Sequence, residues 1–149
     1  MTHYERASER DIPALSELLS HLFTQEIEFH PNEDAQRKGL SAIIGNADIG
    51  AILVARDNTS VLAMVNLLFT VSTALGERVA ILEDMVVAPA ARGTGIGSGL
   101  LNYAIEFAKS CGAKRITLLT DQDNISAQNF YSKHGFALST MRPMRLSIS

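Results

Sequence analysis

Residues 86–101 read VVAPAARGTGIGSGLL, and this stretch decides the fold. It runs from apolar strand residues through a short loop to closely spaced glycines, and then into an amphipathic helix. A helix start presents unpaired backbone N–H groups and the positive end of the helix dipole. Glycines let an anion approach that backbone without a Cβ in the way, and Arg92 adds a positive charge. The stretch therefore predicts a loop that binds a pyrophosphate.

Two other phosphate-binding patterns do not fit this loop. The dinucleotide pattern G-x-G-x-x-G fails because the sixth position is Ser98 when counted from Gly93 and Leu100 when counted from Gly95. The P-loop pattern fails because no Gly-Lys-Ser/Thr follows. The pattern that fits is Arg-x-x-Gly-x-Gly over residues 92–97. The remaining alternative is a glycine-rich turn without a function.

Apolar periodicity and turn residues divide the rest of the chain into strands and helices. Strands are expected over residues 2–7, 51–56, 61–70, 78–87, 115–120, 136–140 and 142–148. Helices are expected from about residue 11 to 22 and over residues 34–44, 97–110 and 124–134. Antiparallel strands come first, and strands alternate with helices later. This order predicts one α/β domain over residues 1–149, with a mixed, mostly antiparallel sheet of about seven strands flanked by helices.

Composition excludes several classes of protein. The chain has 149 residues, of which 46% are hydrophobic and 19% charged, and its net charge of -3 gives no basic field for nucleic acid. The single cysteine, Cys111, excludes an internal disulfide, and the four histidines show no metal-ligand spacing. No apolar run reaches the roughly 18 residues of a membrane span, and the first residues lack a signal peptide's apolar core. We expect a cytoplasmic protein without a metal or a membrane partner.

Residues 92–97 resemble motif A of the GNAT superfamily of acetyltransferases, whose signature is Arg/Gln-x-x-Gly-x-Gly/Ala. The resemblance implies a GNAT-like fold with acetyl-CoA as the co-substrate. It implies that the coenzyme pyrophosphate is held by Arg92, Gly93, Thr94, Gly95, Ile96, Gly97 and Ser98. It further implies that backbone groups of Met85, Val86 and Val87 bind the pantetheine arm and the acetyl carbonyl. In that family a bulge in this strand usually splays it from the next one.

A second segment, NISAQNFYSKHGF at residues 124–136, resembles motif B of the same superfamily, which has Asn, then Ala, then Phe-Tyr, then Gly-Phe. The resemblance implies that Asn124 and Ala127 contact the coenzyme arm and that Tyr131 serves the leaving sulfur. The chemistry agrees, because a phenol with a pKa of about 10 can donate a hydrogen bond or proton to a thiolate. The alternative is that Tyr131 is a core aromatic residue.

The attacking amine needs a group that takes its proton, because an alkyl ammonium has a pKa of about 10.4. The candidates are Glu83 and Asp84, which strand alternation sends to opposite faces. The Leu-Glu-Asp segment is similar to that of the polyamine and diamine acetyltransferases, which implies that Glu83 is the base. Asp84 or a chain of waters is an alternative, as is an ordinary structural role for both acids. Between the first two helices, Glu26, Glu28 and His30 fall where the family often builds its acceptor site, and the alternative is a solvated loop.

These observations predict an N-acetyltransferase that moves an acetyl group directly from acetyl-CoA to a primary amine. The resemblance favours a small polyamine- or diamine-like acceptor, with an amino acid, an aminoglycoside or a protein N-terminus as alternatives. It also implies a homodimer, which is common in the family. The competing hypothesis is a non-catalytic acyl-CoA-binding regulatory module.

Overall fold

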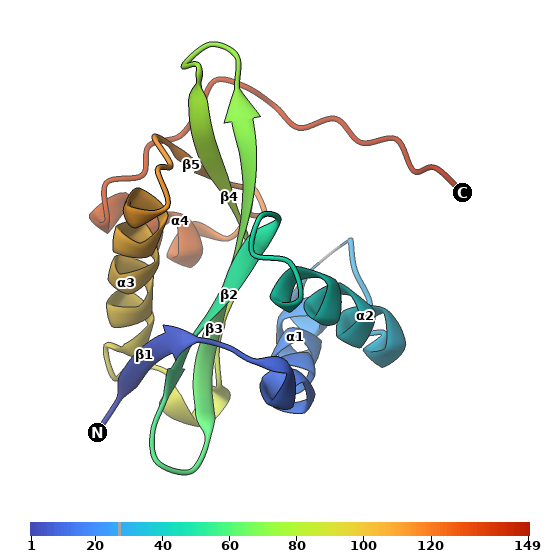
Figure 1. The fold of residues 1–149 in the computed structure, drawn as a ribbon, viewed down its shortest axis with the longest axis vertical. Coiled ribbons are helices and arrows are strands. Elements are labelled where there is room, and N and C mark those ends of the chain that lie inside the picture. Colours follow the sequence, from blue (N-terminus) through green and yellow to red (C-terminus); the bar gives the residue numbers. More distant parts are fainter. Residues whose placement is uncertain (27) are drawn as a thin grey trace. The chain divides into compact units, whose positions relative to one another are not determined.

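The computed structural model describes residues 1–26 and 28–149. Their contacts divide them into two compact units, residues 1–119 and 120–149. The first unit holds a five-stranded sheet in the order β1-β2-β3-β4-β5 (Figure 1). Neighbouring strands are antiparallel except β4 and β5, which are parallel. The strands are β1 (His3–Arg6), β2 (Gly50–Arg56), β3 (Val61–Ser72), β4 (Glu77–Val87) and β5 (Ile116–Leu118).

Helices cover both faces of this sheet. Helices α1 (Ile12–Gln25) and α2 (Glu33–Ile44) pack on one face, and α3 (Ile96–Ser110) packs on the other (Figure 1). Short 3-10 turns, η1 (Glu9–Asp11) and η2 (Pro89–Ala91), precede α1 and α3. The second unit contains α4 (Ile125–Lys133). No helix among the described residues is both long enough and apolar enough to span a membrane.

The core of the first unit explains why β2 and β3 are apolar almost throughout. Strands covered by helices on both faces bury both sets of alternating side chains. On the α1 and α2 face, Ile52, Val54 and Met64 meet leucines of the two helices. The α3 side is filled by the fully buried Leu100 and Leu101. The predicted mixed, mostly antiparallel sheet flanked by helices is therefore confirmed.

Strand β4 carries a bulge at Glu83. Asn66 of β3 lies opposite Asp84, but the next residue, Leu67, lies opposite Leu82, so Glu83 has no cross-strand partner. Opposed residues share a face of the sheet, and Asn66 and Leu67 face opposite ways because side chains alternate. Asp84 therefore joins Asn66 on the face that α1 and α2 cover. If side chains had continued to alternate without a break from Leu82, Glu83 would have faced these helices instead.

The prediction of about seven strands is wrong, because the described residues form five. Neither residues 136–140 nor residues 142–148 form a strand. Apart from the half-buried Phe136, their large apolar side chains are exposed, Met144 by 98% and Ile148 by 89%. Alternating apolar residues show that a segment could bury one face, but a strand forms only where its backbone finds a ladder partner. The other predicted elements are present, and none of their ends is displaced by more than three residues.

A buried ion pair joins the start of α1 to the end of β2. Arg56 Nη2 donates to Asp11 Oδ2 at 2.8 Å, and Arg56 Nε lies 3.2 Å from Glu5 Oε2. Asp11 Oδ2 also accepts from the Ser8 N–H at 2.9 Å. Burial alone would raise the pKa of Asp11, but the hydrogen bonds from Arg56 and Ser8 outweigh it, so the pKa is lowered. The carboxylate thus stays charged inside the fold.

Replacing the cation should destabilise the protein. Arg56→Met should lower the free energy of unfolding at pH 7 by about 2 kcal/mol, because Asp11 then keeps a buried charge with the Ser8 hydrogen bond but without its countercharge. The effect is smaller than for a fully buried pair, since 22% of the Arg56 side chain is exposed. Arg37→Met is the matched control, because the Arg37–Glu33 pair is exposed and should contribute less than about 0.5 kcal/mol. Urea unfolding measures both changes.

The same pair predicts a pH dependence. The folded-state pKa of Asp11 is lowered, so the stabilisation is complete above the unfolded pKa of about 4 and is lost as pH falls through the folded pKa. The difference in stability between wild type and Arg56→Met should therefore shrink in acid. A difference that stays constant down to about pH 2 would contradict a charged Asp11 as its source.

Candidate active site

The glycine loop presents open backbone at the start of α3. Gly93 and Gly95 have φ angles of 77° and 83°, a left-handed conformation that side chains disfavour. Gly95 is the N-cap of α3 and offers no side chain to the helix start. The first hydrogen bond of the helix is from Gly99 N–H to Gly95 O at 3.1 Å, so the N–H groups of residues 96–98 are the free donors of the first turn. This arrangement suits a pyrophosphate.

Two side-chain contacts hold the loop. Thr94 Oγ1 donates to the Ala91 carbonyl at 2.6 Å, which closes the turn between η2 and α3. Arg92 Nε donates to the Val87 carbonyl at 3.1 Å, which fastens the loop to the end of β4. The Arg92 side chain is exposed. Arg92 therefore has a structural contact in addition to the anion-binding role that the sequence predicts.

Strand β4 leaves part of its edge open next to this loop. Its pairing with β5 covers only Ala80 to Leu82 opposite Ile116 to Leu118, and β4 continues to Val87. Beyond Leu82 no residue of the first unit pairs with that edge as a strand. An open strand edge offers N–H and C=O groups to an extended ligand in the way it would to another strand. Met85, Val86 and Val87, which the sequence assigns to the pantetheine arm, form this open edge.

The motif B residues belong to the second unit and start or lie on α4. Asn124 is the N-cap of α4, and its Oδ1 accepts from the Ala127 N–H at 3.0 Å. The Tyr131 ring meets Phe130 and Phe136 edge-on, with centroids 5.3 and 5.6 Å away. Burial raises the pKa of Tyr131 to about 12. The phenol therefore keeps its proton at any physiological pH.

The adjacent acids Glu83 and Asp84 of β4 lie in different environments. Glu83 is exposed on the bulge, whereas Asp84 is partly buried and accepts from Asn66 Nδ2 at 3.2 Å. Burial raises the pKa of Asp84, the Asn66 hydrogen bond opposes the rise, and the nearby charge of Glu83 adds to it. The carboxyl of Asp84 therefore binds a proton more readily than an ordinary aspartate does.

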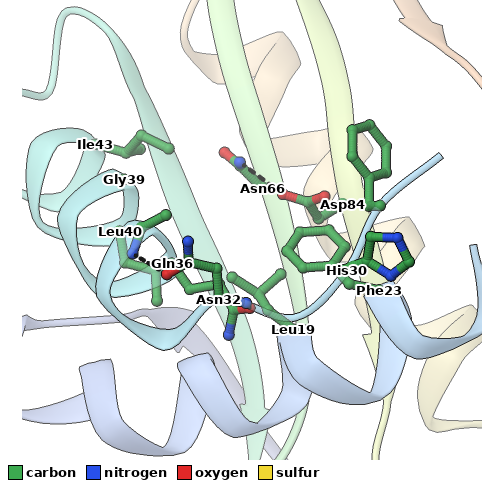
Figure 2. Close-up of a pocket in the computed structure, with 12 residues that line it drawn as sticks. Leu19, Phe23, His30, Asn32, Gln36, Gly39, Leu40, Ile43, Asn66 and Asp84 are labelled. Atoms are coloured by element: carbon green, nitrogen blue, oxygen red, sulfur yellow. Dashed lines mark hydrogen bonds between the residues drawn. The ribbon is translucent and has the colours of Figure 1, made fainter.

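Asp84 lines a cavity between the sheet and the first two helices (Figure 2). The cavity has a volume of about 230 Å³. Its polar side chains include Asp84, Asn66 and His30, of which the sequence singled out His30 and Asp84. The apolar wall consists of Leu19, Phe23, Phe29, Leu40 and Ile43. The segment around Glu26 also includes Ile27, which lies outside the described residues.

The sequence reasoning missed Asn66, although a signal for it was present. Asn66 interrupts the apolar run VLAMVNLLF at residues 61–69. A polar residue within a buried strand is more informative than its apolar neighbours. The sequence could not show that Asn66 lies opposite Asp84, because this pairing depends on the bulge in β4. Among the described residues, no group of three His, Cys, Asp or Glu side chains is placed to bind a metal.

Comparison with known proteins gives the family. The model of the acetyltransferase (GNAT) family matches residues 12–136. The uncharacterized N-acetyltransferase YhfO of Bacillus subtilis is 36% identical over 89 residues, which make up 60% of this chain and 60% of YhfO. The aminoalkylphosphonate N-acetyltransferase of Salmonella typhimurium is 28% identical over 136 residues, 91% of this chain and 85% of that protein. The crystal structure of a possible acetyltransferase from Clostridium difficile 630 matches with a TM-score of 0.89 and 16% identity, over 100% of this chain and 99% of that one.

The chain belongs to the acetyltransferase (GNAT) family. The likeness to the Clostridium difficile structure shows that this chain has the same α/β fold. The described residues of this chain form a sheet of five strands, fewer than the sequence predicted. Membership implies an acyl-CoA donor. The similarity to YhfO spans three-fifths of that protein (60%).

The loop geometry predicts how a single methyl group would act. Gly95→Ala should weaken acetyl-CoA binding by about tenfold, because a Cβ at φ 83° strains the backbone and shifts the donors of the α3 start. Gly76→Ala is the matched control, since Gly76 has a φ of 66° in the turn before β4 and the added Cβ also meets open space. Titration calorimetry with acetyl-CoA and thermal unfolding should show similar destabilisation in both variants. Equal acetyl-CoA affinity in the two would contradict this phosphate site.

Proposed function

We propose that this chain is an acetyl-CoA-dependent N-acetyltransferase that transfers the acetyl group directly to a primary amine. The observation that carries the proposal is the open edge of β4, which ends at the glycine loop before α3. In a chain of this family, the edge suits the pantetheine amides and the loop suits the pyrophosphate. Acetyl-CoA is the donor in this proposal.

The proposed reaction is a direct attack of the amine nitrogen on the thioester carbonyl carbon. Glu83, acting through a water, takes the proton that the amine loses. The C–N bond forms and the C–S bond breaks, while the Tyr131 hydroxyl donates a proton to the departing sulfur. Backbone N–H groups near Val86 stabilise the negative charge on the carbonyl oxygen. Burial raises the pKa of Tyr131 to about 12, which keeps the phenol protonated as a hydrogen-bond donor to the sulfur but makes full transfer of its proton to a thiolate, with a pKa of about 8.5, less favourable.

The competing proposal is a regulatory module that binds acyl-CoA without turnover. Release of coenzyme A thiol from acetyl-CoA distinguishes the two, measured over a panel of polyamines, amino acids, aminoglycosides, short peptides and simple alkyl or aryl amines. Release that depends on an amine supports the enzyme. Binding of acetyl-CoA without release in any reaction supports the module. The polyamine-like acceptor that the Leu-Glu-Asp segment favours is one arm of this panel.

Removing the Tyr131 hydroxyl should slow the chemical step. Tyr131→Phe keeps the aromatic contacts with Phe130 and Phe136 but removes the proton donor. We expect kcat to fall by about 100-fold, with the Kd for acetyl-CoA unchanged. Steady-state thiol release and calorimetry give the two quantities. An unchanged kcat would remove Tyr131 from the mechanism.

The role of Glu83 can be tested against another acid of the same strand. Glu83→Gln should lower kcat/KM by about 100-fold near neutral pH, because the amine loses its proton acceptor. Glu77→Gln is the control, since Glu77 is also exposed on β4 but lies at its far end. If both variants keep wild-type kcat/KM, the proton leaves by another route.

A further inference from the structure

The Asn66 side chain has a hydrogen-bonding group that the described part of the chain does not use. Only 5% of Asn66 is exposed. Its Nδ2 donates to Asp84 Oδ2 at 3.2 Å, whereas Oδ1 is buried and accepts no hydrogen bond. In Figure 2 this oxygen points away from Asp84. A buried acceptor without a partner costs free energy, so a ligand that brings an N–H group is favoured here once the side chains that cover this oxygen move aside.

The neighbouring group also accepts. Asp84 carries a carboxylate in the same cavity, and an ionised carboxylate has acceptor sites only. A neutral primary amine has two N–H groups and one lone pair. One N–H can be received by Asn66 Oδ1 and the other by Asp84, which leaves the lone pair free. The pair is therefore complementary to an amine nitrogen rather than to a hydroxyl or a carbonyl.

The other side chains that line the cavity limit the size and polarity of the rest of the ligand. Leu19, Phe23, Leu40 and Ile43 give it apolar walls, and His30, Asn32 and Gln36 are its other polar side chains. Its volume of about 230 Å³ limits it to a small ligand. No Lys or Arg is among the described residues that line it, and Asp84 is the sole carboxylate among them.

The cavity also lies at the correct distance from the open edge of β4. Asp84 precedes Val86 by two residues on this strand, and a strand rises about 3.4 Å per residue. An amine nitrogen at Asp84 is thus about 7 Å along the strand from the backbone at Val86.

We infer that the acceptor is a small primary amine with one compact hydrocarbon substituent, such as an arylmethyl or branched alkyl amine. The inference rests on the proposed function. Asn66 and Asp84 receive the N–H groups, and the hydrocarbon lies against Phe23, Leu40 and Ile43. A polyamine would place a second ammonium against these apolar side chains. A phosphonate or an amino acid would bring an anion to a wall without Lys or Arg.

The first test compares acceptors with wild-type protein. Thiol release from acetyl-CoA is measured with benzylamine and 3-methylbutylamine against spermidine, putrescine, glycine, 2-aminoethylphosphonate and kanamycin. We expect kcat/KM for the two hydrocarbon amines to exceed every other value by about tenfold or more. A preference for a polyamine, a phosphonate, an amino acid or an aminoglycoside overturns the inference and leaves the proposed function in place.

The second test fills the cavity. Gly39 of α2 lines it, and a Cβ at Gly39 would meet no other heavy atom within 4 Å. Gly39→Leu should raise KM for benzylamine by about tenfold, with KM for ethylamine and for acetyl-CoA unchanged. Gly39→Ala is the control for the backbone and helix effect and should leave KM for benzylamine within about twofold. An unchanged KM for benzylamine in Gly39→Leu overturns the inference.

Binding without turnover separates this inference from the proposed function. Calorimetry compares benzylamine with benzyl alcohol, which has the same size but no amine. Benzylamine that binds at least about tenfold more tightly, and loses this affinity in Gly39→Leu, supports the inference even if no amine is acetylated. In that case the proposed function alone fails. If benzylamine neither binds nor reacts, the inference is overturned.

Discussion

One extra residue in β4 determines which of its acidic side chains faces helices α1 and α2. The bulge at Glu83 shifts the register against β3, so Asp84 takes the place on the α1 and α2 face that Glu83 would have had in a regular strand. Pairing with β5 ends at Leu82, immediately before the bulge. A bulge twists and bends its strand. The same irregularity thus accompanies the open edge of β4 and puts Asp84 beside Asn66.

An apolar cavity beside this pair needs support, because interiors otherwise pack closely and collapse around voids. Gln36 supplies it by joining the two helices that cover this face. Its Nε2 donates to Ser16 O at 2.9 Å and to Ser20 Oγ at 3.1 Å, both on α1. Its Oε1 accepts from the Asn32 N–H at 2.7 Å, and Asn32 Oδ1 caps α2 through the Ala35 N–H at 3.1 Å. The start of α2 is therefore fixed against α1 by polar contacts, and the apolar side chains beside them do not have to fill the space.

The sequence predicted what depends on local pattern and missed what depends on register. Helix α3 begins at Ile96, one residue from the expected start, because glycines and apolar spacing mark it locally. The resemblance implied a bulge in this strand but not its position, and the facing of Asp84 was not predictable because a single unpaired residue reverses it. Residues 142–148 alternate like a strand, yet Met144 and Ile148 remain exposed, because pairing partners are not encoded in the segment itself. Asn66 was visible as a polar residue in an apolar run, but its partner was not.

The pKa values of Asp84 and of an amine in this cavity determine how much free energy the loss of the amine proton would cost. In water an alkyl ammonium has a pKa of about 10.4 and an aspartic acid one of about 3.9, so moving a proton between them costs about 9 kcal/mol. Burial raises the pKa of Asp84, opposed by the Asn66 hydrogen bond and aided by the charge of Glu83. The apolar walls disfavour the charged form of an amine bound beside Asp84, whereas the Asp84 carboxylate itself favours that form. The raised pKa of Asp84 narrows the gap between the two groups but does not close it. The remaining difference has to be met by the base that takes the proton, and the proposed function assigns this role to Glu83 acting through a water.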